Sequence, residues 1–175
     1  GILQHLKASA VPTLAHLLLL GQPSKLEKIV EDKIFIFATQ DITCLDTLIN
    51  DPEEKIAEKI VSILSRMKDD STLKYMMKIA RHPSASVRRM AIKAMGQSFS
   101  NQIPAIFEFI RDPDFTVRKA VLAQLNQSRN ETAENLLLQY LQDQKFDTNE
   151  NEHIIECFRT LGKCGSLRSL PFLHK

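Results

Sequence analysis

Apolar residues recur at intervals of three and four along most of the chain, which is the spacing of an amphipathic helix. This spacing predicts a series of helices with short connections: 2–8, 10–20, 24–38, 42–50, 52–67, 70–81, 84–96, 100–112, 114–126, 130–142 and 153–162. Lys33–Ala38 also suits a strand by propensity, but the helical period before it and the lack of a partner strand favour a helix. The stretch 143–152 is the most polar and irregular connection.

The same spacing predicts which side chains face the core. The expected inward faces are those of Ile56, Ile60, Ile63 and Leu64; Leu73, Met76, Met77 and Ala80; Ile103, Ile106, Phe107 and Ile110; and Ile154, Ile155, Phe158 and Leu161. Gly162 is expected to end the last of these helices as a left-handed cap, a position that favours glycine.

A unit of about 30 residues recurs in the middle of the chain. Pro52, Pro83 and Pro113 are spaced 31 and 30 residues apart, and an apolar residue follows each proline four positions later. Each unit contains two helices, and one such pair cannot bury its own apolar stripe. Stacking of successive pairs is therefore the expected architecture.

The central units carry a recognisable motif. Asp112-Pro113 precedes Val117-Arg118, and Pro83 precedes Val87-Arg88 and an alanine-containing stripe that ends at Gly96. This pattern resembles the HEAT repeat of the armadillo-like family, especially its bacterial variant, the phycobilisome-lyase-like HEAT repeat. The resemblance implies an all-α, right-handed α-solenoid of about five and a half repeats.

We expect one domain over 1–175, with repeat units at 1–22, 23–50, 51–81, 82–111, 112–142 and 143–175. Both ends fall inside a repeat, and neither resembles the polar caps that close an intact solenoid. The sequence is therefore expected to be a fragment of a longer chain. No apolar run in it is long enough to span a membrane, although the full chain could be membrane-anchored.

Two arginines are the most specific residues of the motif. The resemblance implies that Arg88 and Arg118 pair with acidic side chains or helix-end carbonyls at the turns between repeats, with Asp112 as a candidate partner. An arginine fork suits both kinds of acceptor. We predict that Arg88, Asp112 and Arg118 form a structural ladder, that is, a series of equivalent contacts that stabilise successive repeats. The alternative is that the arginines face a bound ligand.

Candidate binding residues lie on the second helix of each unit. The formal net charge is only +2, but residues 66–129 hold twelve Lys or Arg against five Asp or Glu. Second helices line the concave face of HEAT-like stacks, so a weakly basic groove could attract an acidic peptide or a phosphate backbone. The alternative to a basic groove is an ordinary solvated helix face. Phe109 and Tyr140 take equivalent places on successive second helices and are candidate anchors for a partner, the alternative being that they pack against neighbouring repeats. The predicted partner-binding residues are Lys74, Lys78, Arg81, Phe109, Arg111 and Tyr140.

No group of residues predicts catalysis or a cofactor. The sequence lacks a phosphate-binding glycine loop, a nucleophile elbow and a His-Glu metalloprotease motif. The grouping of His153, Cys157 and Cys164 offers only three ligands at wide spacing, so we predict no metal site and buried core cysteines. Three scattered cysteines favour a reducing compartment and a cytoplasmic location.

The leading hypothesis is a non-enzymatic scaffold or regulatory module. Its concave face would bind a protein or peptide partner, or a neighbouring domain of its own chain. Two alternatives remain: a bilin-lyase-like subunit, which the repeat resemblance suggests, and weak nucleic-acid binding through the basic middle repeats. Helical-repeat DNA glycosylases have a similar architecture, but they hold the damaged base against aromatic side chains that include Trp, and this chain contains no Trp.

Overall fold

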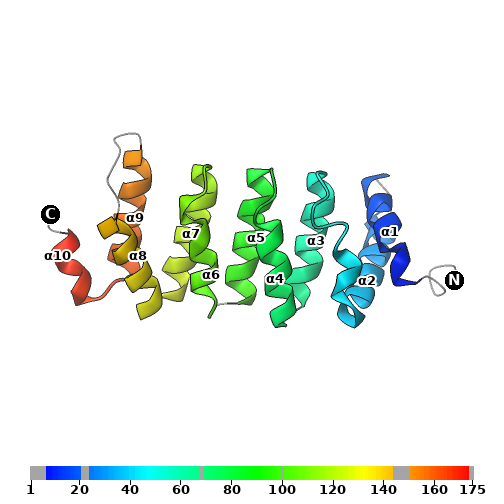
Figure 1. The fold of residues 1–175 in the computed structure, drawn as a ribbon, viewed down its shortest axis with the longest axis horizontal. Coiled ribbons are helices and arrows are strands. Elements are labelled where there is room, and N and C mark those ends of the chain that lie inside the picture. The colour runs from blue at the N-terminus through cyan, green and yellow to red at the C-terminus, as the bar shows by residue number, and fades with distance from the viewer. Residues whose placement is uncertain (1–6, 21–23, 68, 100, 144–149, 174–175) are drawn as a thin grey trace. The chain divides into compact units, whose positions relative to one another are not determined.

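A computed structural model describes residues 7–20, 24–67, 69–99, 101–143 and 150–173 (Figure 1). These residues form helices and connecting turns, and no strand occurs among them. The structure thus confirms the all-α fold class. The chain divides into two compact units, Gly1–Ala94 and Met95–Lys175, which are described separately below.

The first unit contains four complete helices and most of a fifth. Short 3₁₀ helices lie at Ala8–Ala10, Leu18–Leu20 and Ile42–Leu45. The α-helices are α1 (Val11–Leu17), α2 (Ser24–Gln40), α3 (Glu54–Arg66), α4 (Asp70–Ile79) and α5 (Ala85–Ser98), the last turn of which belongs to the second unit. Helix α2 contacts α1 and α3, and α3 contacts α4 beside it (Figure 1).

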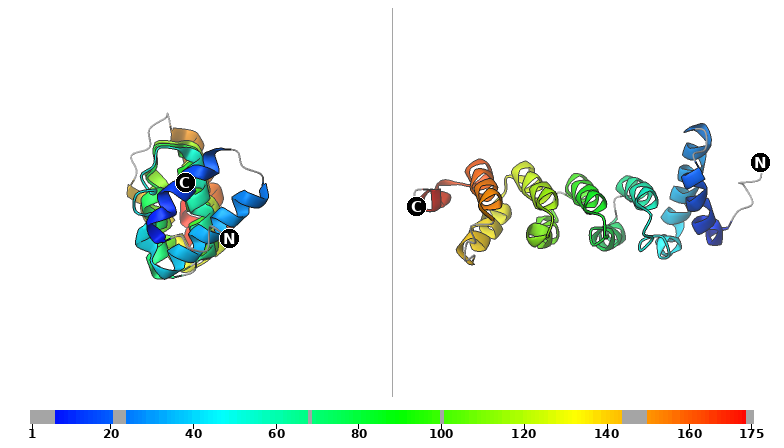
Figure 2. Two further views of the ribbon diagram at one scale, coloured as in Figure 1. Left: turned by 90° about the vertical axis from the view of Figure 1, so that its right-hand side faces the viewer. Right: turned by 90° about the horizontal axis from the view of Figure 1, so that it is seen from above.

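The second unit continues the pairing of helices. Its elements are α6 (Ile103–Phe107) with the 3₁₀ turn η5 (Glu108–Arg111), α7 (Phe115–Ser128), α8 (Glu131–Asp143), α9 (Asn151–Cys164), η7 (Leu167–Ser169) and α10 (Leu170–Leu173). Helix α7 contacts α9, and α6 contacts α8, so the unit has two layers (Figure 2, right). We call α3, α5, α7 and α9 the first helices, and α4, α6 with η5, and α8 the second helices.

Short polar side chains fix where several helices begin. Asp69 and Asp114 each accept a hydrogen bond from a backbone N–H in the first turn of the following helix, and Asn130 does the same for Ala133 at 2.8 Å. Pro12 and Pro104 lie in the first turns of α1 and α6, where the missing N–H costs no helical hydrogen bond. These caps satisfy donors that a helix leaves open at its start.

Burial confirms the expected face of α3, where Ile56, Ile60, Ile63 and Leu64 are at most 1% exposed. It also confirms helix over Lys33–Ala38, which lies within α2. Most of the predicted helix 2–8 falls outside the described residues, and Ala8–Ala10 is a 3₁₀ turn.

Three predictions of local structure were wrong, wholly or in part. The segment 42–50 is a 3₁₀ turn at Ile42–Leu45 followed by turns, and Asp41 caps its start by accepting a hydrogen bond from the Thr43 N–H. Met76 and Ala80 are buried as expected for α4, but Tyr75 and Ile79 are buried with them, while Leu73 and Met77 are only half-buried. The helix expected at 100–112 is an α-helix only to Phe107 and continues as a 3₁₀ turn. Phe107, which was expected to face the core, is only half-buried.

The predicted face of α9 was wrong in part: Leu161 is buried as expected, and Ile154 and Phe158 are half-buried. The predicted burial of Cys157 and Cys164 is confirmed. The buried residues of α9 are His153, Cys157, Thr160, Leu161 and Cys164, whereas Ile155 is 49% exposed. The helix continues through Gly162 to Cys164 and is followed by Gly165 in an extended conformation. Hydropathy ranked the isoleucines above histidine and threonine, but contacts with α7 and α8 decide which side of α9 is buried.

Candidate partner-binding grooves

The turn before each repeat proline has the same hydrogen bond at its centre. Asp51 Oδ1 accepts from the Glu53 N–H at 3.0 Å, and Asp112 Oδ1 accepts from the Asp114 N–H at 2.9 Å. His82 replaces the aspartate in the middle unit, where its Nδ1 accepts from the Ser84 N–H at 3.0 Å. Either side chain therefore serves this position by accepting the N–H two residues later.

The motif arginines reach back to these turns. Arg88 Nη1 donates to the carbonyls of His82 and Pro83 at 3.0 and 2.8 Å. Arg118 Nη1 donates to the carbonyls of Asp112 and Pro113 at 2.6 and 3.1 Å. These are contacts that a structural ladder needs, with backbone carbonyls as the acceptors.

Replacing Arg118 by alanine is expected to lower the melting temperature by several degrees, because two turn carbonyls lose a charged donor worth about 1.5–3 kcal/mol. Thermal melting followed by circular dichroism measures this. Lys119→Ala is the matched control, since Lys119 is the exposed next residue on α7 and should change the midpoint little. An unchanged melting curve for the Arg118 variant would argue against the ladder.

The first unit has a groove at the end of α4. Its lining comes from the turn after the Ile42–Leu45 segment, the end of α4 and the proline turn that follows. The lining residues are Ile49, Asn50, Lys78, Arg81, His82 and Pro83, around a volume of about 400 Å³. Two predicted binding residues, Lys78 and Arg81, thus lie in one groove; Lys74 is exposed on α4 but is not part of its lining.

The second unit has a groove at the equivalent place, between α6–η5 and α8. Its volume is about 260 Å³, and it is lined by Phe107, Glu108, Ile110, Arg111, Leu136, Gln139, Tyr140 and Asp143. Arg111 takes the position of Arg81, two residues before the repeat proline. Its guanidinium carbon lies 5.3 Å from the centre of the Tyr140 ring, so the groove brings two predicted binding residues together.

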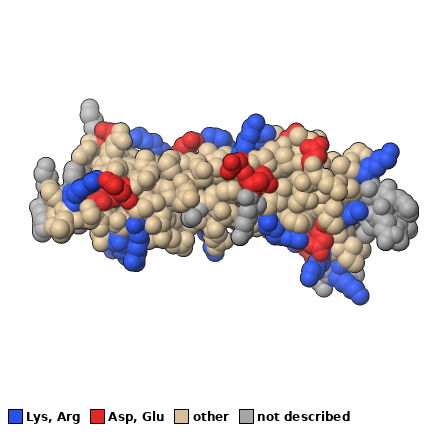
Figure 3. Space-filling model, turned by 90° about the horizontal axis from the view of Figure 1, so that it is seen from below, with Lys and Arg blue, Asp and Glu red and all other residues tan. Residues whose placement is uncertain are grey.

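The two grooves differ in charge. Both charged side chains that line the first groove are cationic, whereas Arg111 in the second groove is accompanied by Glu108 and Asp143. The expected basic character thus applies to the groove in the first unit. On the face drawn in Figure 3, described basic and acidic side chains lie in small alternating groups with uncharged surface between them.

The two candidate aromatic anchors are largely buried. Phe109 and Tyr140 are 8% and 7% exposed, so each offers a partner little of its surface. The Tyr140 hydroxyl lies 3.0 Å from His153 Nε2, and its ring meets that of Phe107 edge-on at 6.1 Å. Their role as anchors stays a prediction; packing already accounts for most of their area.

His153 and Cys157 lie beside Tyr140 inside the second unit. Burial lowers the pKa of His153, and burial raises the pKa of the Cys157 thiol to about 12. Such a thiol stays protonated and is a poor nucleophile and metal ligand. Among the described residues, no three His, Cys, Asp or Glu side chains are arranged to hold a metal ion.

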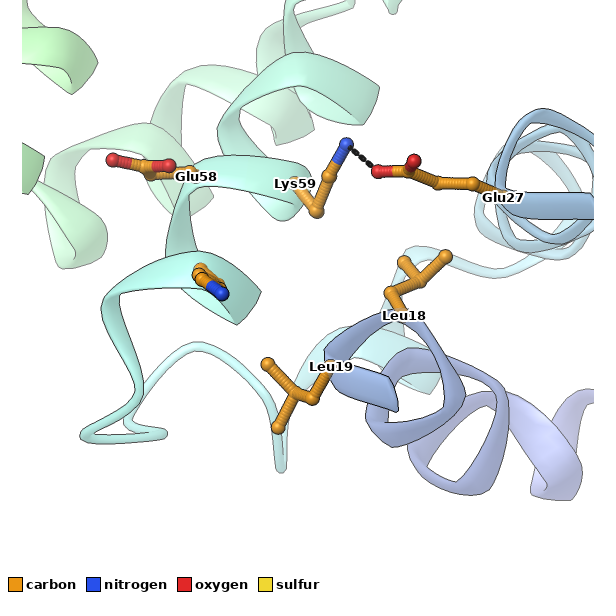
Figure 4. Close-up of a pocket in the computed structure, with 6 residues that line it drawn as sticks. Leu18, Leu19, Glu27, Glu58 and Lys59 are labelled. Atoms are coloured by element: carbon orange, nitrogen blue, oxygen red, sulfur yellow. Dashed lines mark ion pairs between the residues drawn. The ribbon is translucent and has the colours of Figure 1, made fainter. Parts of the chain in front are cut away.

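A third pocket, between the 3₁₀ helix Leu18–Leu20, α2 and α3, holds about 300 Å³ (Figure 4). Leu18 and Leu19 point into it, and Lys59 forms ion pairs with Glu27 and, at 2.6 Å, with Glu31. Those hydrogen bonds raise the pKa of Lys59. Glu27 and Glu31 both belong to α2, so the Lys59 ion pairs join α3 to α2. Because the charge of Lys59 is already compensated by these partners, we assign no ligand to this pocket.

The sequence analysis missed a polar contact in the second unit. Glu134 on α8 is 3% exposed, and its Oε1 accepts hydrogen bonds from the Ser166 N–H, the Ser166 hydroxyl and the Ser169 hydroxyl. The pKa of Glu134 is lowered, and the hydrogen bond from the Ser169 hydroxyl contributes most to this shift. The sequence did hold a signal for this contact. Glu134 lies between Ala133 and Leu137 on the apolar stripe of α8, and a buried charge on such a stripe needs a hydrogen-bonding partner.

Comparison with known proteins identifies the repeats. A family model described as HEAT repeats matches residues 43–105 and 81–156. No curated protein and no solved structure gave a significant match. Within the described ranges, every helix is too short or too polar to cross a membrane.

Proposed function

The chain belongs to the HEAT-repeat family, whose members are generally non-catalytic protein-interaction scaffolds, and on that premise we propose that it binds a protein partner along its second helices. The partner is a separate protein or a neighbouring domain of the same chain. One observation carries the proposal: each unit has a groove beside its second helices, and each groove is lined by an arginine two residues before a repeat proline. The two arginines lie on opposite walls of their grooves, since Asn50 takes the place of Arg111 in the first groove.

The physical basis is shape together with charge. Grooves between neighbouring elements offer partly buried apolar walls, and exposed charges at their rims favour a partner of complementary charge. Such binding needs no catalytic group.

Site-specific photocrosslinking tests this proposal. A photoreactive amino acid at Asn50 or Gln139, each exposed and lining one groove, is expected to crosslink a partner in cells of the source organism. The matched controls are Arg89 and Lys119, which are exposed at equivalent places on the first helices α5 and α7. Crosslinks that form equally from both sets of positions, or from neither, would contradict binding along the second helices.

A further inference from the structure

The groove at the end of α4 differs from its counterpart because the only charged side chains lining it are cations. The Lys78 side chain is 46% exposed, so its ammonium is accessible to solvent, although it forms a long ion pair with the Asp46 carboxylate at 4.0 Å. Arg81 is exposed at the end of the same helix, three residues further on. A carboxylate bound between them would meet two full positive charges, which outweigh the partial negative charge at the C-terminal end of the helix.

The floor and far wall of this groove are apolar. Ile49 is 3% exposed and belongs to the turn that follows Ile42–Leu45, and Pro83 lies in the opposite turn. Ile49 forms a largely covered floor, and the exposed Pro83 supplies most of the apolar surface next to the cationic pair. A ligand that matches the groove therefore combines an apolar side chain with a nearby negative charge.

His82 holds the two walls at a fixed separation. Its Nε2 lies 3.1 Å from the Asp51 carbonyl, to which it donates, and its Nδ1 accepts from the Ser84 N–H. The ring is 5% exposed, so the bridge is protected from water. A groove that is already held open avoids part of the ordering cost of binding.

We propose that this groove binds an acidic peptide segment, with a carboxylate side chain between Lys78 and Arg81 and an adjacent apolar side chain against Pro83, above the floor formed by Ile49. The inference rests on the proposed function and specifies the partner chemistry for one of the two grooves. An extended peptide is favoured over nucleic acid because only two cations, Lys78 and Arg81, line the groove, and they adjoin an apolar wall. A surface that binds nucleic acid usually contacts many phosphates with a longer row of cations.

The test is an NMR titration of the ¹⁵N-labelled 175-residue chain with two synthetic peptides, (Glu-Leu-Ser)₄ and (Gln-Leu-Ser)₄. The glutamate peptide is expected to shift the amides of Ile49, Asn50 and His82, and to bind about tenfold more tightly than the glutamine peptide at low salt. Equal binding of both peptides, or no shift at millimolar concentration of either, would overturn the inference. This comparison does not depend on any variant folding.

Charge reversal provides a second measurement. Lys78→Glu with Arg81→Glu is expected to weaken binding of the glutamate peptide at least about tenfold. The control, Arg89→Glu with Lys93→Glu, makes the same charge change at exposed positions of α5 and should leave binding within about twofold. An equal loss in both variants would mean that only net charge matters, and would refute the groove as the site.

Three further outcomes separate the inference from the proposed function. Shifts of the same amides by the oligonucleotide dT₁₂, with none from the glutamate peptide, would replace the peptide with nucleic acid as the ligand. If a partner crosslinks at Gln139 while neither peptide shifts the first groove, the acidic-peptide inference fails and the scaffold function stands. Loss of all groove crosslinks would remove the proposed function itself.

Discussion

Replacing Glu134 by alanine is expected to release the segment 166–169 from α8, with a loss of about 2–3 kcal/mol of the free energy that holds it in place. One carboxylate oxygen accepts from the Ser166 N–H at 2.8 Å, the Ser166 hydroxyl at 2.9 Å and the Ser169 hydroxyl at 2.5 Å. Ser169 is 1% exposed, so its hydroxyl loses a partner that water cannot easily replace. Hydrogen exchange of the Ser166 and Ser169 amides measures the release directly.

Acid should reproduce part of this effect. These hydrogen bonds hold the pKa of Glu134 below its usual value, so the carboxylate stabilises the folded state at pH values above its unfolded pKa. That contribution is lost as the pH falls through the lower pKa of the folded state. The difference in stability between the natural chain and the Glu134→Gln variant should therefore shrink as the pH falls below about 4.

Glu131 provides the matched control. It lies on the same helix and pairs with Arg168 of the same segment at 2.9 Å, but its side chain is 70% exposed. Exposed pairs contribute about 0–1 kcal/mol, so Glu131→Ala should alter exchange in the segment only slightly. Similar effects of the two alanine variants would mean that burial of Glu134 adds nothing to this contact.

The sequence predicts helices well where each position has one clear preference. Around α3, isoleucines and leucine alternate with charged residues, so the 3.6-residue period identifies both the helix and its buried face. In α9, by contrast, histidine, threonine and cysteine occupy the buried face. Only the contacts of α7 and α8 with that helix determine its orientation, and those contacts join residues far apart in the chain.

The candidate sites show the same division. The recurring offset from the repeat proline placed Arg81 and Arg111 at equivalent positions, and both line grooves. It could not show that Asn50 and His82 complete the first groove, or that Phe109 and Tyr140 are mostly buried. Those features depend on how neighbouring repeats pack, so a pattern within one repeat does not contain them.

Packing between repeats also explains why a glycine stands at position 96. Helix α5 continues through Gly96 to Ser98, so the glycine is not needed to end the helix. A Cβ atom there would overlap the side chain of Gln124 on α7, with its Cγ only 2.7 Å away. Gln124 is 4% exposed, and because the overlap reaches Cγ, its whole side chain would have to move within a packed interior.

We therefore expect Gly96→Ala to destabilise the protein by about 1–3 kcal/mol, although alanine favours a helix over glycine by about 1 kcal/mol. Gln124→Ala alone should cost less, since it removes a buried Oε1 that has no hydrogen-bond partner among the described residues. The double variant should then recover most of the stability lost in Gly96→Ala. Urea denaturation of the four proteins gives this coupling energy.

The sign of the coupling decides between two explanations of Gly96. Recovery in the double variant would show that the glycine is required because Gln124 fills the space beside α5. Additive effects would mean that the Gly96→Ala cost arises elsewhere, for example in the turn that follows Ser98. In that case the requirement for a small residue at position 96 would not come from its contact with Gln124.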